Sequence, residues 1–174
     1  MIRGFDPIAR DDARVLVLGT IPSQRSLAEG RYYAHPQNSF WKIMEALFAD
    51  GARLDYSDRA EMLRRSRVAL WDVLQAAERP GSMDSSIVAG AAVPNDIAAF
   101  LREHKQVDSI FFNGATAEKL FRDRVAATLP LAPALTVVRL PSTSPAHASM
   151  SFDQKLAAWE VVSEAVMRNR QATS

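Results

Sequence analysis

The chain alternates between short apolar runs and longer segments whose apolar residues recur at helical spacing. Four runs predict strands, because each is apolar, rich in branched side chains and bounded by polar residues, Gly or Pro. Short apolar runs of this kind are typical of strands buried on both faces of a parallel sheet. The predicted strands are residues 14–19, 68–74, 109–114 and 135–141.

Helical spacing fills the intervals between these strands. Phe40, Trp41 and Met44 belong to one apolar series, and Gly51 follows it as a stop signal. The predicted helices cover 38–50, 57–65 with Ser57 or Asp58 as its cap, 95–104 with Asn95 as its cap, 115–129, and 152–169.

Alternating strands and helices predict an α/β fold with a mostly parallel sheet. A length of 174 residues favours one domain, and no internal repeat or low-complexity stretch divides the chain. We therefore expect a single domain over residues 1–174, with a frayed tail from about residue 170.

The composition is ordinary for a globular protein, with 48% apolar and 24% charged residues. The net charge is only +1, so binding of a polyanion has to rely on local basic clusters rather than on bulk charge. The N-terminus lacks the apolar run of a signal peptide, and no stretch approaches the roughly 20 apolar residues of a membrane span. We therefore expect a cytoplasmic protein without a membrane partner.

Missing residue types and motifs exclude several chemistries. The absence of cysteine removes disulfides, thiolate zinc sites, Cys-ligated iron–sulfur clusters and cysteine nucleophiles. Neither the Gly-x-x-x-x-Gly-Lys loop of nucleotide triphosphatases nor the Gly-x-Ser-x-Gly elbow of hydrolases occurs. The histidines are scattered, at His35, His104 and His147, so we expect no metal site.

Ligands of open α/β sheets bind beyond the carboxyl ends of the strands, and the residues found there suit a ligand. Gly19 allows the backbone to approach a ligand closely, and Pro22 stiffens the turn that follows. An ordinary strand exit has the same composition, so the argument depends on several strand ends together. Those ends are 19–23, 113–114 and 141–145, with Asp72 inside the second predicted strand.

The segment from His35 to Trp41 brings an amide and two aromatic rings to the start of the first predicted helix. Asn38 carries both donors and an acceptor, so it can hold a water molecule or bind the edge of a base. Phe40 offers a face on which a base can stack, whereas we expect Trp41 in the core. The alternative is that Asn38 only caps the helix and that Phe40 is also core.

The last two strand ends carry further polar groups. Asn113 either points its amide at a ligand's carbonyl and ring N–H or forms a turn before Gly114. The loop after the fourth strand contains short hydroxyls and two prolines, which suits phosphate oxygens, although it can also be a plain polar connection. We expect Ser142, Thr143, Ser144, Pro145, Ala146 and His147 to form a loop that binds the phosphates of a nucleic acid such as DNA, together with Ser23.

Charged residues give weaker signals. The basic run Arg64–Arg67 is more typical of a solvated face than of a DNA contact. Asp72 and Asp84 are the acids nearest to the candidate loops. Either can act as a general base, although a structural hydrogen-bonding role is more common for such residues.

Together these segments resemble the uracil-DNA glycosylase superfamily, and within it most of all the hypoxanthine (deoxyinosine) DNA glycosylase branch, also called family six. Each matching piece is short, but the pieces occur in order and span most of the chain. They are Gly19-Thr20-Ile21-Pro22-Ser23 with Ser26-Leu27, residues 32–41, Trp71-Asp72-Val73 with residues 81–87, Phe112-Asn113-Gly114, and residues 140–146.

The resemblance implies a three-layer α/β/α sandwich around a four-stranded sheet. It implies a monofunctional enzyme that hydrolyses the N-glycosidic bond of a deaminated base, chiefly hypoxanthine, in DNA without metal or cofactor. Asn38 matches the catalytic Asn of that branch. Ile21 stands where mismatch-specific relatives carry Asn, and Leu140 stands where classical uracil enzymes carry a catalytic His, so neither can perform that task. We expect the protein to act as a monomer.

Under this hypothesis the target nucleotide flips out of the duplex and enters the site. Asn38 orients the attacking water, because an amide is too weak a base to remove a proton from it. Gly19, Thr20 and Ile21 bind the base together with Phe40 and Asn113. A uracil- or mismatch-specific glycosylase, a non-catalytic binder of damaged DNA and a small-molecule α/β enzyme are the alternatives.

Overall fold

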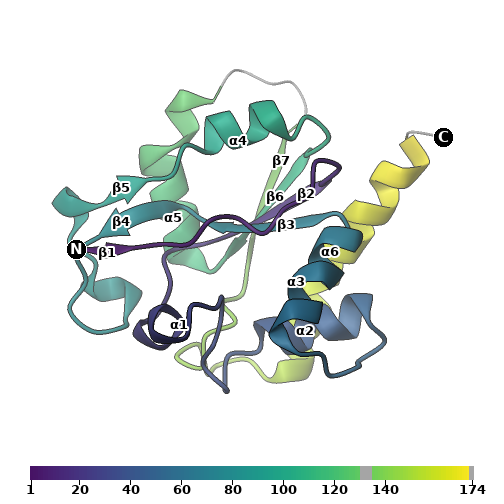
Figure 1. Cartoon of the computed structure of the whole chain (residues 1–174), viewed down its shortest axis with the longest axis horizontal. Helices are drawn as coiled ribbons and strands as arrows, with labels where there is room; N and C mark the ends of the chain where they lie inside the picture. The colour runs from purple at the N-terminus through teal and green to yellow at the C-terminus, as the bar shows by residue number, and fades with distance from the viewer. Residues whose placement is uncertain (130–134, 173–174) are drawn as a thin grey trace.

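The computed structural model describes residues 1–129 and 135–172 (Figure 1). Within this part of the chain, the larger sheet has four strands in the order β3-β2-β6-β7, and all neighbouring pairs are parallel. The strands are β2 (Val15–Gly19), β3 (Val68–Asp72), β6 (Ser109–Asn113) and β7 (Thr136–Leu140). The parallel sheet predicted from the apolar runs is confirmed, and β2, which has a neighbour on each side, is buried along its whole length.

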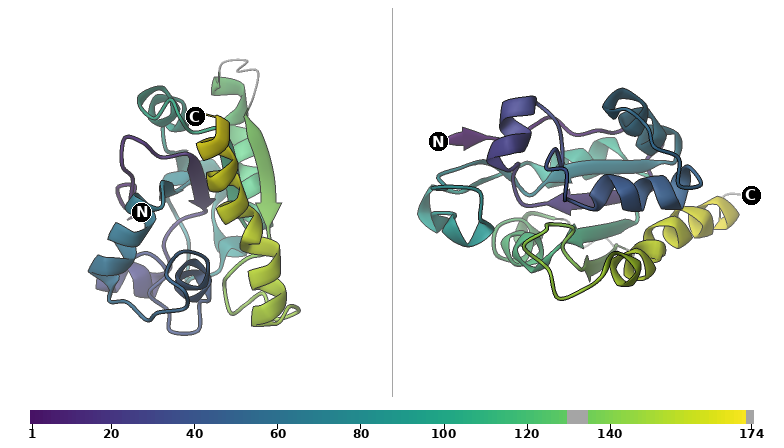
Figure 2. Two further views of the ribbon diagram at one scale, coloured as in Figure 1. Left: turned by 90° about the vertical axis from the view of Figure 1, so that its right-hand side faces the viewer. Right: turned by 90° about the horizontal axis from the view of Figure 1, so that it is seen from below.

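Different helices cover the two faces of this sheet (Figures 1 and 2). Side chains alternate along β2, so Val15 and Val17 join one hydrophobic core while Leu16 and Leu18 join the other. The three layers implied by the family resemblance are confirmed. The first face carries α2 (Phe40–Phe48), α3 (Tyr56–Arg65) and α6 (Phe152–Ala172), and the second carries α4 (Ile97–Glu103) and α5 (Ala115–Arg124).

Several short elements were not predicted from the sequence. A small antiparallel sheet in the order β1-β4-β5 lies beside the large sheet. A short helix, α1, follows β2 along the chain. These elements are β1 (Ile2–Arg3), β4 (Leu74–Ala77), β5 (Val93–Pro94), α1 (Gln24–Glu29), and the 3-10 helices η1 (Asp84–Ser86), η2 (Ala89–Ala91) and η3 (Ala126–Thr128).

The predicted strand 68–74 is wrong at its end. The chain leaves the parallel sheet after Asp72 and enters β4 of the antiparallel sheet at Leu74. The N–H groups of Val73 and Leu74 donate to the carbonyls of Gly19 and Thr20, at 2.8 and 3.1 Å. One continuous apolar run therefore supplies two strands, and Asp72 lies at the carboxyl end of β3 rather than inside a strand.

Two helix caps also differ from the prediction. Asp96, not Asn95, caps α4, because its side chain accepts from the N–H of Ala99. The amide of Asn95 instead donates to the Asp72 carbonyl at 2.8 Å. Asp55 caps α3 in place of Ser57 or Asp58.

The later helices differ in length from their predictions. The helix predicted over 115–129 ends at Arg124 and is followed by η3, and α6 continues to Ala172, beyond the predicted end at 169. Residues 173–174 of the predicted frayed tail lie outside the described residues. Among the described residues, no helix has the length and apolar character needed to cross a membrane.

Truncating one core residue on each face tests the two-core arrangement. Leu63 of α3 and Ile97 of α4 are buried in different cores, so Leu63→Ala and Ile97→Ala should each lower the free energy of unfolding by about 2–5 kcal/mol. Because the sheet separates the two sites, the double variant should equal the sum of the single changes within about 0.5 kcal/mol. Urea denaturation measures all three, and strong non-additivity would contradict two separate cores.

Candidate active site

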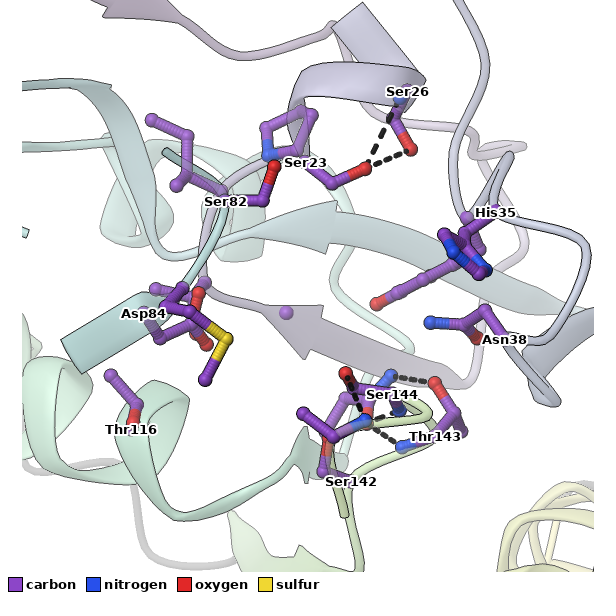
Figure 3. A pocket seen from close by; sticks show the side chains of 18 of the residues that line it. Ser23, Ser26, His35, Asn38, Ser82, Asp84, Thr116, Ser142, Thr143 and Ser144 are labelled. Atoms are coloured by element: carbon purple, nitrogen blue, oxygen red, sulfur yellow. Dashed lines mark hydrogen bonds between the residues drawn. The ribbon is translucent and has the colours of Figure 1, made fainter. Parts of the chain in front are cut away.

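A pocket of about 520 Å³ opens at the carboxyl ends of the parallel strands. Its wall combines the strand ends with the loop between α1 and α2 and with residues 82–85, and Figure 3 shows these segments around one hollow. Of the site residues predicted from the sequence, the following line it: Gly19, Thr20, Ile21, Ser23, Asn38, Asn113, Ser142, Thr143, Ser144, Pro145, Ala146 and His147.

Gly19 forms part of the floor of the pocket, and the space around it admits no side chain. A Cβ added there would lie 2.6 Å from Asp72 Oδ1 and 2.7 Å from Tyr33 Oη. Gly19 and Asp72 are register partners at the ends of β2 and β3. The absence of a Cβ at Gly19 therefore lets a carboxyl group and a phenol approach the backbone from two different segments.

Asn38 lies at the start of α2 with its amide shared between two tasks. Its Oδ1 accepts from the N–H of Phe40 at 2.9 Å, which supports the first turn of α2, although the N-cap residue of that helix is Ser39. Figure 3 shows its amide nitrogen turned toward the interior of the pocket. Because an amide oxygen has a second lone pair, the capping bond leaves Asn38 able to donate to and accept from a ligand.

Phe40 does not line the pocket, and its predicted stacking role is wrong for this arrangement. As the first residue of α2, it is directed into the core and is fully buried. Its ring centre lies 4.3 Å from that of Tyr33, which does line the pocket. The alternative that Phe40 is a core residue is therefore correct, and Tyr33 separates it from the pocket.

Tyr33 is a site residue that the sequence reasoning missed. Its φ of 54° lies in the left-handed region, which is unusual for a bulky aromatic residue and is typical of a strained functional position. Its hydroxyl reaches Gly19, and among the described residues that hydroxyl has no hydrogen-bond partner. Burial and the nearby charge of Asp72 raise the pKa of this phenol. Tyr33 lies within residues 32–41, one of the segments that carry the family resemblance, but no local pattern predicts a role for it.

The loop after β7 is held from behind by several side chains. Asn113 binds Thr143 twice: its Nδ2 donates to Thr143 Oγ1 and its Oδ1 accepts from the Thr143 N–H, both at 2.9 Å. Trp159 Nε1 donates to the Pro141 carbonyl at 2.9 Å, and Lys155 Nζ donates to the Ser144 carbonyl at 3.3 Å. In this structure Asn113 therefore fixes the loop, while one amide proton remains for a ligand.

Asp72 and Asp84 bring two carboxyl groups to the same pocket. Asp72 is only 4% exposed, and its Oδ2 has no hydrogen-bond partner among the described residues. Burial, assisted by the charge of Asp84, raises the pKa of Asp72 to about 7, and Arg79 opposes this shift. Burial also raises the pKa of Asp84, against a hydrogen bond with Thr20 and the charge of Arg79.

Other charged groups contribute less to the pocket. Within the described residues, no group of three or more His, Asp or Glu is arranged to hold a metal ion. The basic run at the end of α3 lies outside the pocket lining. Arg64 and Arg65 form ion pairs with Glu61, and Arg67 forms one with Asp12. The N-termini of α2 and α5 follow Asn38 and Gly114, and their positive ends favour negative charge at this edge of the sheet.

Comparison with known proteins gives concordant matches. A family model described as the uracil DNA glycosylase superfamily matches residues 6–163. A hypoxanthine DNA glycosylase from Methanosarcina acetivorans is 30% identical over 164 residues, which are 92% of this chain and 96% of that protein. A hypoxanthine DNA glycosylase from Methanosarcina barkeri is 34% identical over 86 residues, which are 49% of this chain and 54% of that protein. The solution NMR structure of a candidate uracil DNA glycosylase from Methanosarcina acetivorans has a TM-score of 0.75 at 28% identity and covers 95% of this chain and 98% of its own.

Fold and site together define an α/β protein whose ligand pocket lies at the carboxyl edge of a parallel sheet. Because the family model covers most of its length, the chain belongs to the uracil DNA glycosylase superfamily. The resemblance inferred from the sequence and the fold class that it implied are both confirmed.

The raised pKa of Asp72 predicts a pH dependence of stability. Its pKa rises on folding from 3.8 to about 7, so the folded protein binds this proton more tightly than the unfolded chain does. The stabilisation is fully present below about pH 4 and is lost as the pH rises through about 7. Between pH 4 and pH 8 the wild type should therefore lose about 2–4 kcal/mol more unfolding free energy than Asp72→Asn, measured by urea denaturation. Equal losses in both proteins would contradict the buried neutral carboxyl group.

Proposed function

We propose that this protein is a monofunctional DNA glycosylase that excises deaminated bases, chiefly hypoxanthine from deoxyinosine. The observation that carries the proposal is the meeting of Asn38, the 19–23 turn and the 142–147 loop around one pocket. A match over nearly the full length to a hypoxanthine DNA glycosylase supports the same substrate. A volume of about 520 Å³ lies within the range of small-molecule pockets and is large enough for a purine base.

A base stacked inside a duplex cannot reach this pocket, so the nucleotide has to flip out. Unstacking costs a few kcal/mol, and a mispaired base such as hypoxanthine costs least. The 142–147 loop, with Ser23, presents hydroxyls and N–H groups that suit the phosphates beside the flipped nucleotide. Its attachment to Asn113, Trp159 and Lys155 keeps this surface in place before DNA arrives.

The flipped base is bound at the pocket floor by backbone groups of the 19–21 turn. Ile21 has no polar side-chain atom, so this turn supplies shape and backbone hydrogen bonds rather than a catalytic side chain. Tyr33 supplies the aromatic ring in place of Phe40, which supports it from the core at 4.3 Å.

Asn38 positions the water molecule that captures the sugar. Cleavage of the glycosidic bond develops positive charge on the sugar and negative charge on the departing base. The amide of Asn38 can hold the water by one donated and one accepted hydrogen bond while its oxygen also accepts from the Phe40 N–H. No cofactor is needed for this hydrolysis, because water is the only other reactant.

Removing the Asn38 amide should abolish most activity without unfolding the protein. Duplexes that contain a single deoxyinosine, deoxyuridine or deoxyxanthosine are incubated with the enzyme, and abasic sites are then cleaved with alkali. We expect the wild type to act best on deoxyinosine and Asn38→Ala to lose about 100-fold or more in single-turnover rate.

Asn38→Ser is the matched control, because a serine hydroxyl can bind the N–H two residues on but cannot reach the water. It should be as inactive as Asn38→Ala and as stable as the wild type. Full activity in Asn38→Ser would make Asn38 a structural cap only. If the wild type released none of the three bases, the enzymatic proposal itself would fail.

Tyr33 and Phe40 should have separable effects. Tyr33→Ala removes the ring that lines the pocket, and the loss of base stacking should weaken substrate binding by about 10- to 100-fold, while Tyr33→Phe should bind nearly normally. Phe40→Leu should mainly lower thermal stability, because Phe40 is wholly buried. Fluorescence anisotropy with an uncleavable deoxyinosine analogue measures binding. Equal losses from Tyr33→Ala and Tyr33→Phe would contradict stacking.

A further inference from the structure

We propose that Asp72, a buried carboxyl group of the pocket lining, is the acid that protonates the purine base as it leaves, and that Asp84 assists it from the same pocket. This inference rests on the proposed function, because it assigns the fate of the leaving base in that reaction. It adds a second catalytic residue, at the end of β3 beside Gly19.

The geometry begins with the position of Asp72 at the floor of the pocket. Its Oδ1 lies 2.6 Å from the position that a Cβ on Gly19 would occupy. The carboxyl group is therefore adjacent to the backbone that is proposed to receive the base. Its Oδ2 is buried and has no hydrogen-bond partner among the described residues. A buried carboxylate with an unsatisfied oxygen is costly, which favours the protonated acid. Because Asp72 belongs to the pocket lining, the acid has a proton to offer to a ligand there.

Asp84 approaches the same pocket from η1, a separate segment. Figure 3 shows Asp84 and Asn38 on opposite sides of the hollow. The pocket therefore has an amide on one side, where water can be held, and the Asp84 carboxyl group on the other, while Asp72 lies beside Gly19 at the end of β3. Such a division suits a reaction in which water attacks the sugar while the base departs with a proton.

The charges around Asp72 favour one shared proton near neutral pH. Burial raises the pKa of Asp72 most, the charge of Asp84 raises it further, and Arg79 lowers it. The hydroxyls of Tyr32 and Tyr33 are close enough for Asp72 to raise their own pKa values. Arg79 donates to the carbonyls of Pro22 and Gly81 at 2.8 and 2.9 Å and forms no ion pair with either carboxyl group among the described residues. Its charge lowers the pKa of both Asp72 and Asp84, but burial outweighs it, so two carboxylates at one pocket cannot both ionise cheaply.

The proposed step balances as a hydrolysis. The bond between C1′ and N9 breaks, and its electron pair goes to the base. The Asp72 proton moves to N7, so hypoxanthine leaves as a neutral molecule and Asp72 is left as a carboxylate. The water oxygen bonds to C1′, and the proton that the water loses passes through solvent to restore Asp72. A pyrimidine such as uracil has no equivalent basic ring nitrogen, so the acid favours purines.

The experiment compares pH–rate profiles for the wild type, Asp72→Asn and Asp84→Asn on a deoxyinosine duplex in single turnover. Because the acid must be protonated, the wild-type rate should fall above about pH 7. Asp72→Asn should lose about 100-fold or more at pH 6 and show no such fall. Asp84→Asn should retain the fall but move it to lower pH, because it removes the charge that raises the pKa of Asp72. Asp11→Asn, at an exposed residue, is the control and should leave the profile unchanged.

A substrate change separates proton transfer from a structural role. In 7-deaza-2′-deoxyinosine the N7 acceptor is replaced by carbon, so the wild type should act slowly on it and Asp72→Asn should cause little further loss. Asp72→Asn should also affect residual deoxyuridine cleavage much less than deoxyinosine cleavage. A structural defect would instead lower the rate on all substrates by the same factor.

The outcomes distinguish the two levels of the proposal. No base release by the wild type overturns the proposed function. Hypoxanthine release by the wild type, with an unchanged rate and pH profile in Asp72→Asn, overturns only this inference. If Asp72→Asn does not fold, the pH profile of Asp84→Asn and the 7-deaza substrate still test proton donation by Asp72. An unshifted profile together with normal cleavage of the 7-deaza substrate refutes proton donation.

Discussion

The parallel pairing of β3, β2, β6 and β7 is the constraint on which the rest of this structure depends. Parallel strands all end at the same edge, so loops from four distant parts of the chain are forced to meet there. Gly19 is paired with Asp72, and Asn113 with Leu140, which brings the four ends to one level. Each strand end can then contribute a different group: a bare backbone, a carboxyl or an amide.

That edge is held rigid by contacts that join the loops to each other. Thr143 is central, because it is bound twice by Asn113 and its carbonyl accepts from the backbone N–H of Ser39. These bonds link the loop after β7 to the end of β6 and to the start of α2, where Asn38 lies. An enzyme that must place a water molecule and a base within a fraction of an ångström benefits from such preorganisation.

The buried carboxyl groups come at a cost to the fold. Asp72 lies beneath the pocket with an unsatisfied oxygen, and Tyr33 adopts a left-handed backbone conformation to place its hydroxyl nearby. Strain and unpaired polar groups of this kind cluster at functional sites, where a ligand can relieve them. The two large cores on either side of the sheet supply the stability that offsets this local cost.

The sequence by itself determined the elements whose signal is local. Apolar runs identified β2 and β6, because burial on both faces leaves a composition that can be seen along the chain. Branched residues also identified β7, although this edge strand is exposed along most of its length. Turn-forming residues at the ends of these strands located the pocket. Only the tertiary structure decided that the run 68–74 divides between two sheets and that Tyr33 rather than Phe40 lines the pocket. Strand partners and the direction of an aromatic side chain depend on neighbours far away in sequence, and no local pattern records them.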